Sequence, residues 1–236
     1  MNSKWGKKGL VSNWRIILAC LHYFVGYQYV YYNVIFYIGY WLTGTTDFYM
    51  YTLIPLDILV LVTTVALLLP YIKESWYRFK FGAWDNIKSC LSFTWWMFLT
   101  SSILSIVISG ITGLGGSANQ DGLNEIASIY PWLIIFASIV FAPIVEELIF
   151  RGIFYRHIRP YVGNGWATLI SSVSFGLLHV YDSIFTGNYL DLVYIILFSA
   201  MGFILVKIYE ETDSIVGSII VHSLYNTIGV LLSFTL

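Results

Sequence analysis

Long apolar runs dominate this chain and limit what it can fold into. They cover residues 16–42, 49–72, 89–113, 131–156, 166–187, 189–209 and 214–236. A run of about 20 apolar residues is long enough to cross the hydrocarbon core of a membrane as a helix. Only 11% of the 236 residues are charged, whereas soluble domains have about 25%. The sequence therefore predicts an all-α fold, a polytopic transmembrane helical bundle with about seven spans, or eight as the alternative.

The positions of the basic residues predict the orientation of these spans. None of the 12 Lys and Arg residues falls in the loops near 43–48, 114–130 and 184–190. They lie before the first run, between the second and third, at the end of the fourth and at the end of the sixth. Because basic loops stay in the cytoplasm, we expect a cytoplasmic N-terminus and an outer C-terminus. The aromatic and basic segment 73–88 is expected to lie along the inner interface as an amphipathic helix.

Several other features narrow the class of protein. The net charge of −1 gives no electrostatic reason to expect nucleic acid as a partner. Cys20 and Cys90 lie in apolar stretches and are expected to be small core residues. No small-residue cleavage signature follows the N-terminal segment, so the first run is expected to be a retained helix. The prediction is a multi-pass protein in contact with membrane lipid, and the composition favours a bacterial cytoplasmic membrane. Nothing predicts its oligomeric state.

The segment FAPIVEELIFRG places three ionisable residues in the fourth run, where charge is costly and therefore indicates function. Glu147 and Arg151 are four residues apart, so they share a helix face and can form an ion pair. Glu146 points about 100° away from Glu147 and is left without this arginine. This asymmetry suits a supporting carboxylate beside a chemically active one. The alternative is an ion pair at the inner headgroups with no catalytic role.

Two later runs carry polar residues at the same four-residue spacing. Phe175 and His179 lie in SVSFGLLHVYD, and His222 and Asn226 lie in IIVHSLYNTIG. Taken alone, His179 is more often a packing residue, and His222 with Asn226 more often an interhelical hydrogen-bond pair. If the three faces meet, they supply a carboxylate, two imidazoles and a carboxamide. A carboxylate and an imidazole can activate water, and the remaining groups can donate hydrogen bonds to an oxyanion.

Depth in the membrane is consistent with this convergence for two of the three faces. At 1.5 Å per residue, Glu146 lies about 22 Å from the outer boundary and His222 about 12 Å from the inner one. These depths match in a core of about 30 Å. His179 lies about 20 Å from the inner boundary, which places it about 10 Å too far out. Tilt, or a fifth helix that starts deeper, would close this gap.

The ordered set of three motifs resembles the CPBP family of CAAX-type proteases and bacteriocin-processing enzymes, also called the Abi family. The matching residues are EExxxR at Glu146, Glu147 and Arg151, FxxxH at Phe175 and His179, and HxxxN at His222 and Asn226. They cover residues 146–226, whereas residues 1–130 carry no signature of that family. We therefore expect one membrane domain, 1–236, with variable N-terminal helices in 1–130 and a catalytic core in 131–236.

The resemblance implies an intramembrane endopeptidase in which Glu146 and His179 activate water. It implies that His222 and Asn226 stabilise the oxyanion, with Glu147, Arg151 and Phe175 in support. We prefer a mechanism without a cofactor, because asparagine is a poor zinc ligand and no HExxH is present. Zinc held by His179, His222 and Glu146 is the alternative.

The expected substrate is a membrane-associated peptide or pro-peptide at the inner leaflet. Two other functions stay open at this point. One is a non-catalytic partner, such as a bacteriocin-immunity or membrane-regulatory protein. The other is a transporter or proton relay, because buried Glu and His also serve that role. No inverted repeat or pair of broken helices supports transport.

Overall fold

The structure is a computed structural model that describes residues 10–45 and 47–234. Most of these residues are helical, and no strand occurs among them. The elements in chain order are α1 (Asn13–Cys20), η1 (Leu21–Tyr31), α2 (Tyr32–Thr43), α3 (Asp47–Lys80), α4 (Ala83–Thr112), α5 (Ala118–Ile129), α6 (Pro131–Phe136), η2 (Ala137–Phe141), α7 (Ala142–Glu147), η3 (Leu148–His157), α8 (Arg159–Val162), α9 (Asn164–Phe185), η4 (Tyr189–Tyr194), α10 (Ile195–Thr212) and α11 (Ile215–Ser233). The predicted polytopic helical bundle is confirmed.

Within the described residues, six helices are long and apolar enough to cross a membrane. They are Thr52–Lys80, Ala83–Thr112, Pro131–Val162, Asn164–Phe185, Tyr189–Thr212 and Ile215–Ser233. The run from α1 through α2 is helical as expected but is not one of the six. Its many tyrosines make it less apolar than the others. The predicted count of seven spans and the predicted orientation stay predictions.

Two connections differ from the sequence-based expectation. Segment 73–88 forms no separate interfacial helix, because α3 continues to Lys80 and α4 begins at Ala83 after a short turn. Its aromatic and basic residues instead lie at the ends of two long helices. Residues 114–130 were expected to be a loop but contain α5, whose first turn is capped when Ser117 Oγ accepts a hydrogen bond from the Gln120 amide at 3.2 Å.

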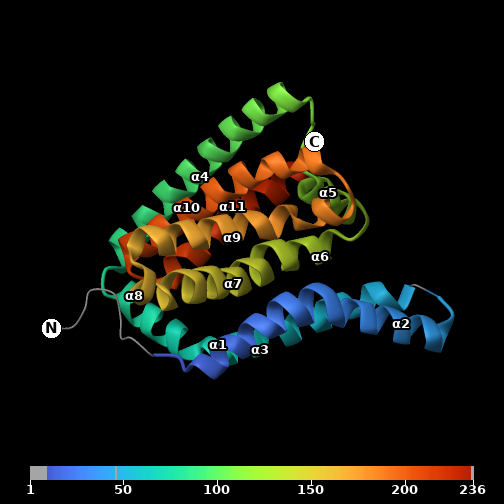
Figure 1. Cartoon of the computed structure of the whole chain (residues 1–236), viewed down its shortest axis with the longest axis horizontal. Coiled ribbons are helices and arrows are strands. Elements are labelled where there is room, and N and C mark those ends of the chain that lie inside the picture. The colour runs from blue at the N-terminus through green and yellow to red at the C-terminus, as the bar shows by residue number, and fades with distance from the viewer. Residues whose placement is uncertain (1–9, 46, 235–236) are drawn as a thin grey trace.

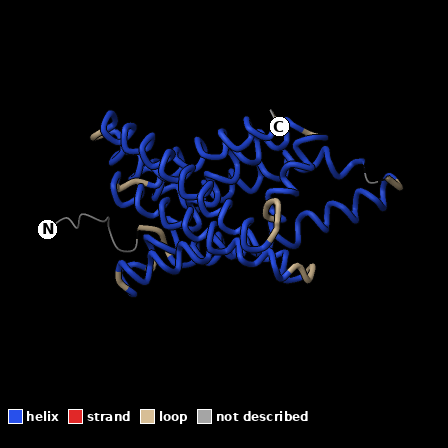
Figure 2. The backbone as a smooth tube through the Cα atoms, turned by 90° about the horizontal axis from the view of Figure 1, so that it is seen from above, coloured by secondary structure: helices blue, strands red, loops and turns tan. Residues whose placement is uncertain are grey.

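The molecule has an N-terminal layer and a core (Figure 1). In the N-terminal layer, α1, η1 and α2 run beside α3. The core contains α4 and the helices from α6 to α11, and α10 packs against α4, α9 and α11. Figure 2 shows the helices side by side, with short loops at both ends of the bundle. Helix α3 joins the two parts because it also contacts η2, η3 and α11.

A buried carboxylate holds the N-terminal layer together. Asp57 on α3 is 2% exposed and accepts hydrogen bonds from the hydroxyls of Tyr27 at 3.1 Å and Tyr32 at 2.8 Å. On the same run, His22 Nδ1 is hydrogen-bonded to the Tyr31 hydroxyl at 2.7 Å. The contacts of Asp57 therefore tie η1 and α2 to α3.

Two glycines allow the closest helix packing in the core. A Cβ atom at Gly202 of α10 would lie 3.0 Å from the Cα and carbonyl oxygen of Ser172 on α9. A Cβ atom at Gly176 of α9 would lie 2.9 Å from the carbonyl oxygen of Ile195. Small residues at such positions let membrane helices approach closely. Helix α9, which carries Phe175 and His179, is thereby held firmly against α10.

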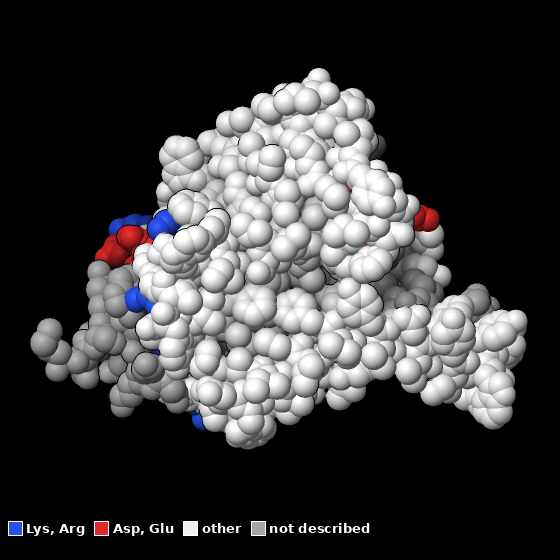
Figure 3. Space-filling view, viewed as in Figure 1, with Lys and Arg blue, Asp and Glu red and all other residues white. Residues whose placement is uncertain are grey.

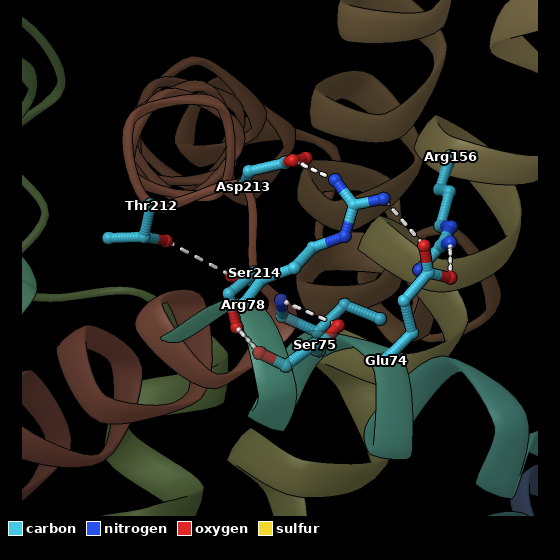
Figure 4. Close-up of polar contacts among 8 residues, drawn as sticks. Glu74, Ser75, Arg78, Arg156, Thr212, Asp213 and Ser214 are labelled. Atoms are coloured by element: carbon cyan, nitrogen blue, oxygen red, sulfur yellow. Dashed lines mark hydrogen bonds and ion pairs between the residues drawn. The ribbon is translucent and has the colours of Figure 1, made fainter. Parts of the chain in front are cut away.

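A polar cluster ties α3 to η3 and to the turn between α10 and α11 (Figure 4). Glu74 accepts hydrogen bonds from Arg78 at 2.6 Å and from Arg156 of η3, and Arg78 also donates to Asp213 in the turn between α10 and α11. Ser214 Oγ donates to the Ser75 carbonyl at 2.9 Å. Three of the basic residues used to predict orientation, Lys4, Lys7 and Lys8, lie outside the described residues.

Candidate functional site

The residues of the three motifs gather around one cavity in the core. Helix α7 supplies the two glutamates, η3 supplies the arginine, and α9 and α11 supply the other two motifs. The cavity has a volume of about 460 Å³ and is lined by Glu146, Phe175, His179, His222 and Asn226, among others. Glu147 and Arg151 lie behind its wall and do not line it. Its size is in the range of small-ligand sites, about 300–1,000 Å³.

The helix that carries the glutamates has wide turns on both sides of them. Helix α7 is preceded by the π-helical η2 and followed by the π-helical η3. Pro143, near the start of α7, has no amide hydrogen to donate, so the regular α-helical ladder cannot continue through it. Wide turns of this kind occur often at functional sites because they change the direction in which side chains point.

Glu147 is the centre of a buried charge network. Its Oε1 lies 3.1 Å from Arg151 Nη1 and 2.9 Å from His222 Nδ1. Glu147 and Arg151 are both 0% exposed. The ion pair predicted from the four-residue spacing is therefore present. The contact with His222 was not predicted, because nothing in the sequence indicates which face of α11 turns toward α7.

Arg151 has further partners that hold it in place. Its Nη2 donates to the carbonyl oxygen of Gly202 at 3.0 Å, and its guanidinium lies 4.7 Å from the centre of the Phe175 ring. A cation over an aromatic face is stabilised by the ring's quadrupole, most strongly where water is absent. Phe175 thus packs against Arg151 of the first motif and against His179 of its own motif.

Glu146 faces the cavity, in contrast to its neighbour. It is 8% exposed, and its Oε2 has no hydrogen-bond partner among the residues that the structure describes. Consecutive helical residues diverge by about 100°, which separates the two carboxylates as expected. A buried carboxylate oxygen without a protein partner is available to a water molecule or a substrate.

His179 also lines the cavity, so the predicted difference in depth does not keep it away. Its Nδ1 is 2.8 Å from the carbonyl oxygen of Phe175. A carbonyl oxygen can only accept, so Nδ1 carries the hydrogen and Nε2 is left as an acceptor. The imidazole ring lies between the rings of Phe175 and Phe198, each 4.5 Å away between centres.

His222 and Asn226 complete the set. Because the Glu147 carboxylate is hydrogen-bonded to His222 Nδ1, the other ring nitrogen is free to face the cavity. The His222 ring lies 5.7 Å from Phe175, so both imidazoles pack against one phenyl ring. Asn226 Nδ2 donates one hydrogen to the Ser138 carbonyl at 2.7 Å, which orients the amide and leaves its second N–H available.

Three side chains from the N-terminal layer also line the cavity, and the sequence did not single them out. They are Tyr23, Tyr27 and Gln28 of η1. The Tyr181 hydroxyl of α9 donates to Gln28 Oε1 at 3.3 Å, which bridges the layer and the core. The sequence offered one signal, a polar Gln28 inside a tyrosine-rich apolar run, but it did not indicate which helix lay opposite.

The possible zinc ligands lie on three different helices. Among the residues that the structure describes, no three His, Cys, Asp or Glu side chains lie close enough together to hold one metal ion. The proposed set of His179, His222 and Glu146 lines one cavity but does not form such a group. We therefore derive no chemical step through a metal.

Comparison with known proteins gives two kinds of match. Residues 128–228 match a protein family described as "Type II CAAX prenyl endopeptidase Rce1-like". The chain is 34% identical over 123 residues to the Bacillus subtilis protein named "Putative membrane peptidase YdiL", covering 52% of this chain and 46% of that protein. It is 27% identical over 177 residues to "UPF0177 protein YxdF" of Lactococcus lactis, covering 73% and 89%.

The family match coincides with part of the core of the structure. The family match contains all three motifs and leaves out the N-terminal layer. The matched region spans about half of the length of the Bacillus relative. No solved structure matches the chain.

Proposed function

We propose that this multi-pass membrane protein belongs to the CPBP family of CAAX-type proteases and is an intramembrane endopeptidase that hydrolyses a membrane-associated peptide or pro-peptide. The match of residues 128–228 to the Rce1-like family and the likeness to a putative membrane peptidase support this proposal. One observation carries the proposal. A single cavity contains a carboxylate with an unpartnered oxygen, two imidazoles and a carboxamide.

Glu146 is the proposed general base. Its carboxylate takes a proton from a water molecule, and the water oxygen attacks the carbonyl carbon of the scissile peptide bond. His179 Nε2, an acceptor, orients the same water through its second hydrogen. When the C–N bond breaks, Glu146 returns the proton to the leaving amine nitrogen. A positioned base of this kind contributes about 10²–10⁴-fold in rate.

His222 and Asn226 are the proposed oxyanion site. The negative charge that develops on the peptide carbonyl oxygen accepts hydrogen bonds from the second N–H of Asn226 and from Nε2–H of protonated His222. The Glu147 carboxylate lies 2.9 Å from Nδ1 and orients the ring. Loss of one oxyanion donor costs about 10²–10³-fold in rate.

Glu147 and Arg151 act through these groups and do not touch the substrate. Their ion pair holds His222 at one end, and Arg151 supports the Phe175 ring at the other.

The metal-independent mechanism predicts that a chelator such as 1,10-phenanthroline leaves cleavage unchanged. A chelator-sensitive activity restored by zinc would favour the alternative. We place the protein in a bacterial cytoplasmic membrane, since both relatives are bacterial.

The deciding experiment compares Glu146→Gln with the matched control Glu125→Gln. Glu125 is exposed on α5 and does not line the cavity. Both variants are purified in micelles and incubated with a library of quenched fluorescent peptides that carry apolar ends, and products are identified by mass spectrometry. We expect Glu146→Gln to lose at least 100-fold in cleavage rate while Glu125→Gln retains it. Full cleavage by a folded Glu146→Gln protein would rule out this mechanism and favour a non-catalytic binding role.

A further inference from the structure

The two ends of the molecule differ in charge. Eight of the described Lys and Arg residues lie toward the end of the bundle that holds the turn between α3 and α4, the end of η3 and the turn between α10 and α11. Figure 3 shows Lys and Arg in blue at the left of the view. The eight are Arg15, Lys73, Arg78, Lys80, Lys88, Arg156, Arg159 and Lys207. The ninth, Arg151, is fully buried. At the opposite end the same view shows acidic residues and no blue. We call these the basic end and the opposite end.

The cavity is closed toward the basic end. Directly below Glu146 along the helix, the side chains of Glu147, Leu148, Phe150 and Arg151 are all 0% exposed. None of them lines the cavity. The Glu147–Arg151 ion pair and the Phe150 ring therefore close the cavity on this side. A peptide could reach Glu146 from the basic end only if these contacts were broken.

The cavity instead extends toward the opposite end. Its wall continues along α9 from His179 to Thr186 and along α11 from Asn226 to Ser233. It then includes the α5 residues Asn119, Gln120 and Asn124. These residues belong to the last turns of α9 and α11 and to the connection between α4 and α6. The rim therefore lies at the end that carries no Lys or Arg among the described residues.

Hydrogen bonds to a buried carboxylate, Asp191, hold the rim of the cavity in place. Asp191 is 1% exposed and accepts hydrogen bonds from the Ala118 amide at 2.8 Å and from Ser183 Oγ at 2.6 Å. A carboxylate at a helix N-terminus is favourable because unpaired amides gather there. Asp191 thereby fixes the start of α5 beside the end of α9. Carboxamides then line the rim on α5, where they can bond the N–H and C=O groups of an extended peptide.

Resting on the proposed function, we propose that the peptide substrate enters this cavity from the end opposite to the basic residues. The positive-inside rule assigns that end to the extracytoplasmic face. The rim carries Asp182 and carboxamides but no cation among its described residues, so it suits an extended segment that is neutral or positively charged. This proposal replaces the inner-leaflet substrate expected from the sequence with a peptide presented at the outer leaflet.

Cysteine labelling tests the direction of entry independently of catalysis. Cys20 and Cys90 are first replaced by alanine, and single cysteines are introduced as Asn124→Cys at the rim, Ser128→Cys on the same helix outside the cavity, and Lys88→Cys at the basic end. Intact cells are treated with a membrane-impermeant sulfonated maleimide. We expect Asn124→Cys and Ser128→Cys to be labelled in intact cells, and Lys88→Cys only after permeabilisation. The reverse pattern would overturn the proposal.

Cleavage before and after labelling tests whether the rim is the route. A maleimide on Asn124→Cys should reduce cleavage at least 10-fold relative to the same protein before modification, whereas one on Ser128→Cys should leave it unchanged. Cleavage that persists fully after modification of Asn124→Cys would exclude this route. If no unmodified variant cleaves any peptide, the proposed function fails, while the labelling pattern still decides which face the rim occupies.

Discussion

The N-terminal layer and the core each contain a buried carboxylate, but the two are stabilised in different ways. In the layer, Asp57 accepts hydrogen bonds from two tyrosine hydroxyls and has no cation beside it among the described residues. In the core, Glu147 faces Arg151 and His222. The first arrangement joins two helices. The second joins Glu147 and Arg151 of one motif to His222 of another and orients a ring that lines the cavity. The partners of a buried carboxylate therefore distinguish a contact that joins two helices from one that joins residues of several motifs.

The largest expected effect comes from removing the carboxylate of Glu147. Glu147→Ala leaves Arg151 charged and fully buried without its ion pair, which typically costs about 3–5 kcal/mol. Asp57→Ala removes the carboxylate that accepts from the hydroxyls of Tyr27 and Tyr32 and should cost about 1–3 kcal/mol. Thermal unfolding in micelles measures both. Equal losses would break the comparison, because they would show that the charge network in the core adds nothing beyond ordinary hydrogen bonds.

A double variant sharpens this prediction. Removing both charges with Glu147→Gln and Arg151→Met leaves no unpaired ion, so it should recover much of the stability lost in Glu147→Ala. It should not recover cleavage, because His222 would still lack the carboxylate against its Nδ1. Recovery of both would show that Glu147 serves only to neutralise Arg151.

The second prediction compares two glycines. Gly202→Ala places a Cβ atom 3.0 Å from the backbone of Ser172, so α9 and α10 must separate at a cost of about 1–3 kcal/mol. Gly110 of α4 has no atom within 4 Å of its Cβ position, so Gly110→Ala should be neutral or stabilising by up to about 1 kcal/mol. Unfolding curves for the pair give the difference. A stable Gly202→Ala protein would mean that α9 is not held by this contact.

The smallest expected effect comes from changing Gln28, which the N-terminal layer contributes to the wall of the cavity. Gln28→Ala removes the acceptor for Tyr181 and part of the wall without touching a motif residue. We expect KM to rise about 3-fold with kcat nearly unchanged, which is the pattern for lost uniform binding. Asn33→Ala lies on the same run, exposed and outside the cavity, and should change neither. A fall in kcat alone would place Gln28 in the chemical step.

Much of this arrangement follows from local sequence rules. The apolar runs predicted the helices because chain length and hydrophobicity decide which segments cross a membrane. The four-residue spacing predicted the Glu147–Arg151 ion pair because it depends on one helix only. Both predictions concern contacts within a single segment.

What the sequence did not predict concerns contacts between segments. The hydrogen bond between Glu147 and His222, 75 residues apart, depends on how α11 rotates against α7. The contribution of Gln28 to the cavity depends on where the N-terminal layer docks. Segment 73–88 is divided between the long helices α3 and α4, where Glu74 and Arg78 form a polar cluster with Arg156 and Asp213. None of these contacts between segments produces a periodic pattern in the sequence of one helix.

The position of Glu147 and Arg151 on a single helix also affects how the chain is inserted during synthesis. A lone charge at the centre of a membrane helix raises the free energy of insertion by about 2.5–3.5 kcal/mol. Since the two residues are four apart, they can neutralise one another as soon as Pro131–Val162 becomes helical. His222, the third member, is translated 75 residues later. The segment therefore brings its own counter-ion into the translocon, and its integration does not have to wait for α11.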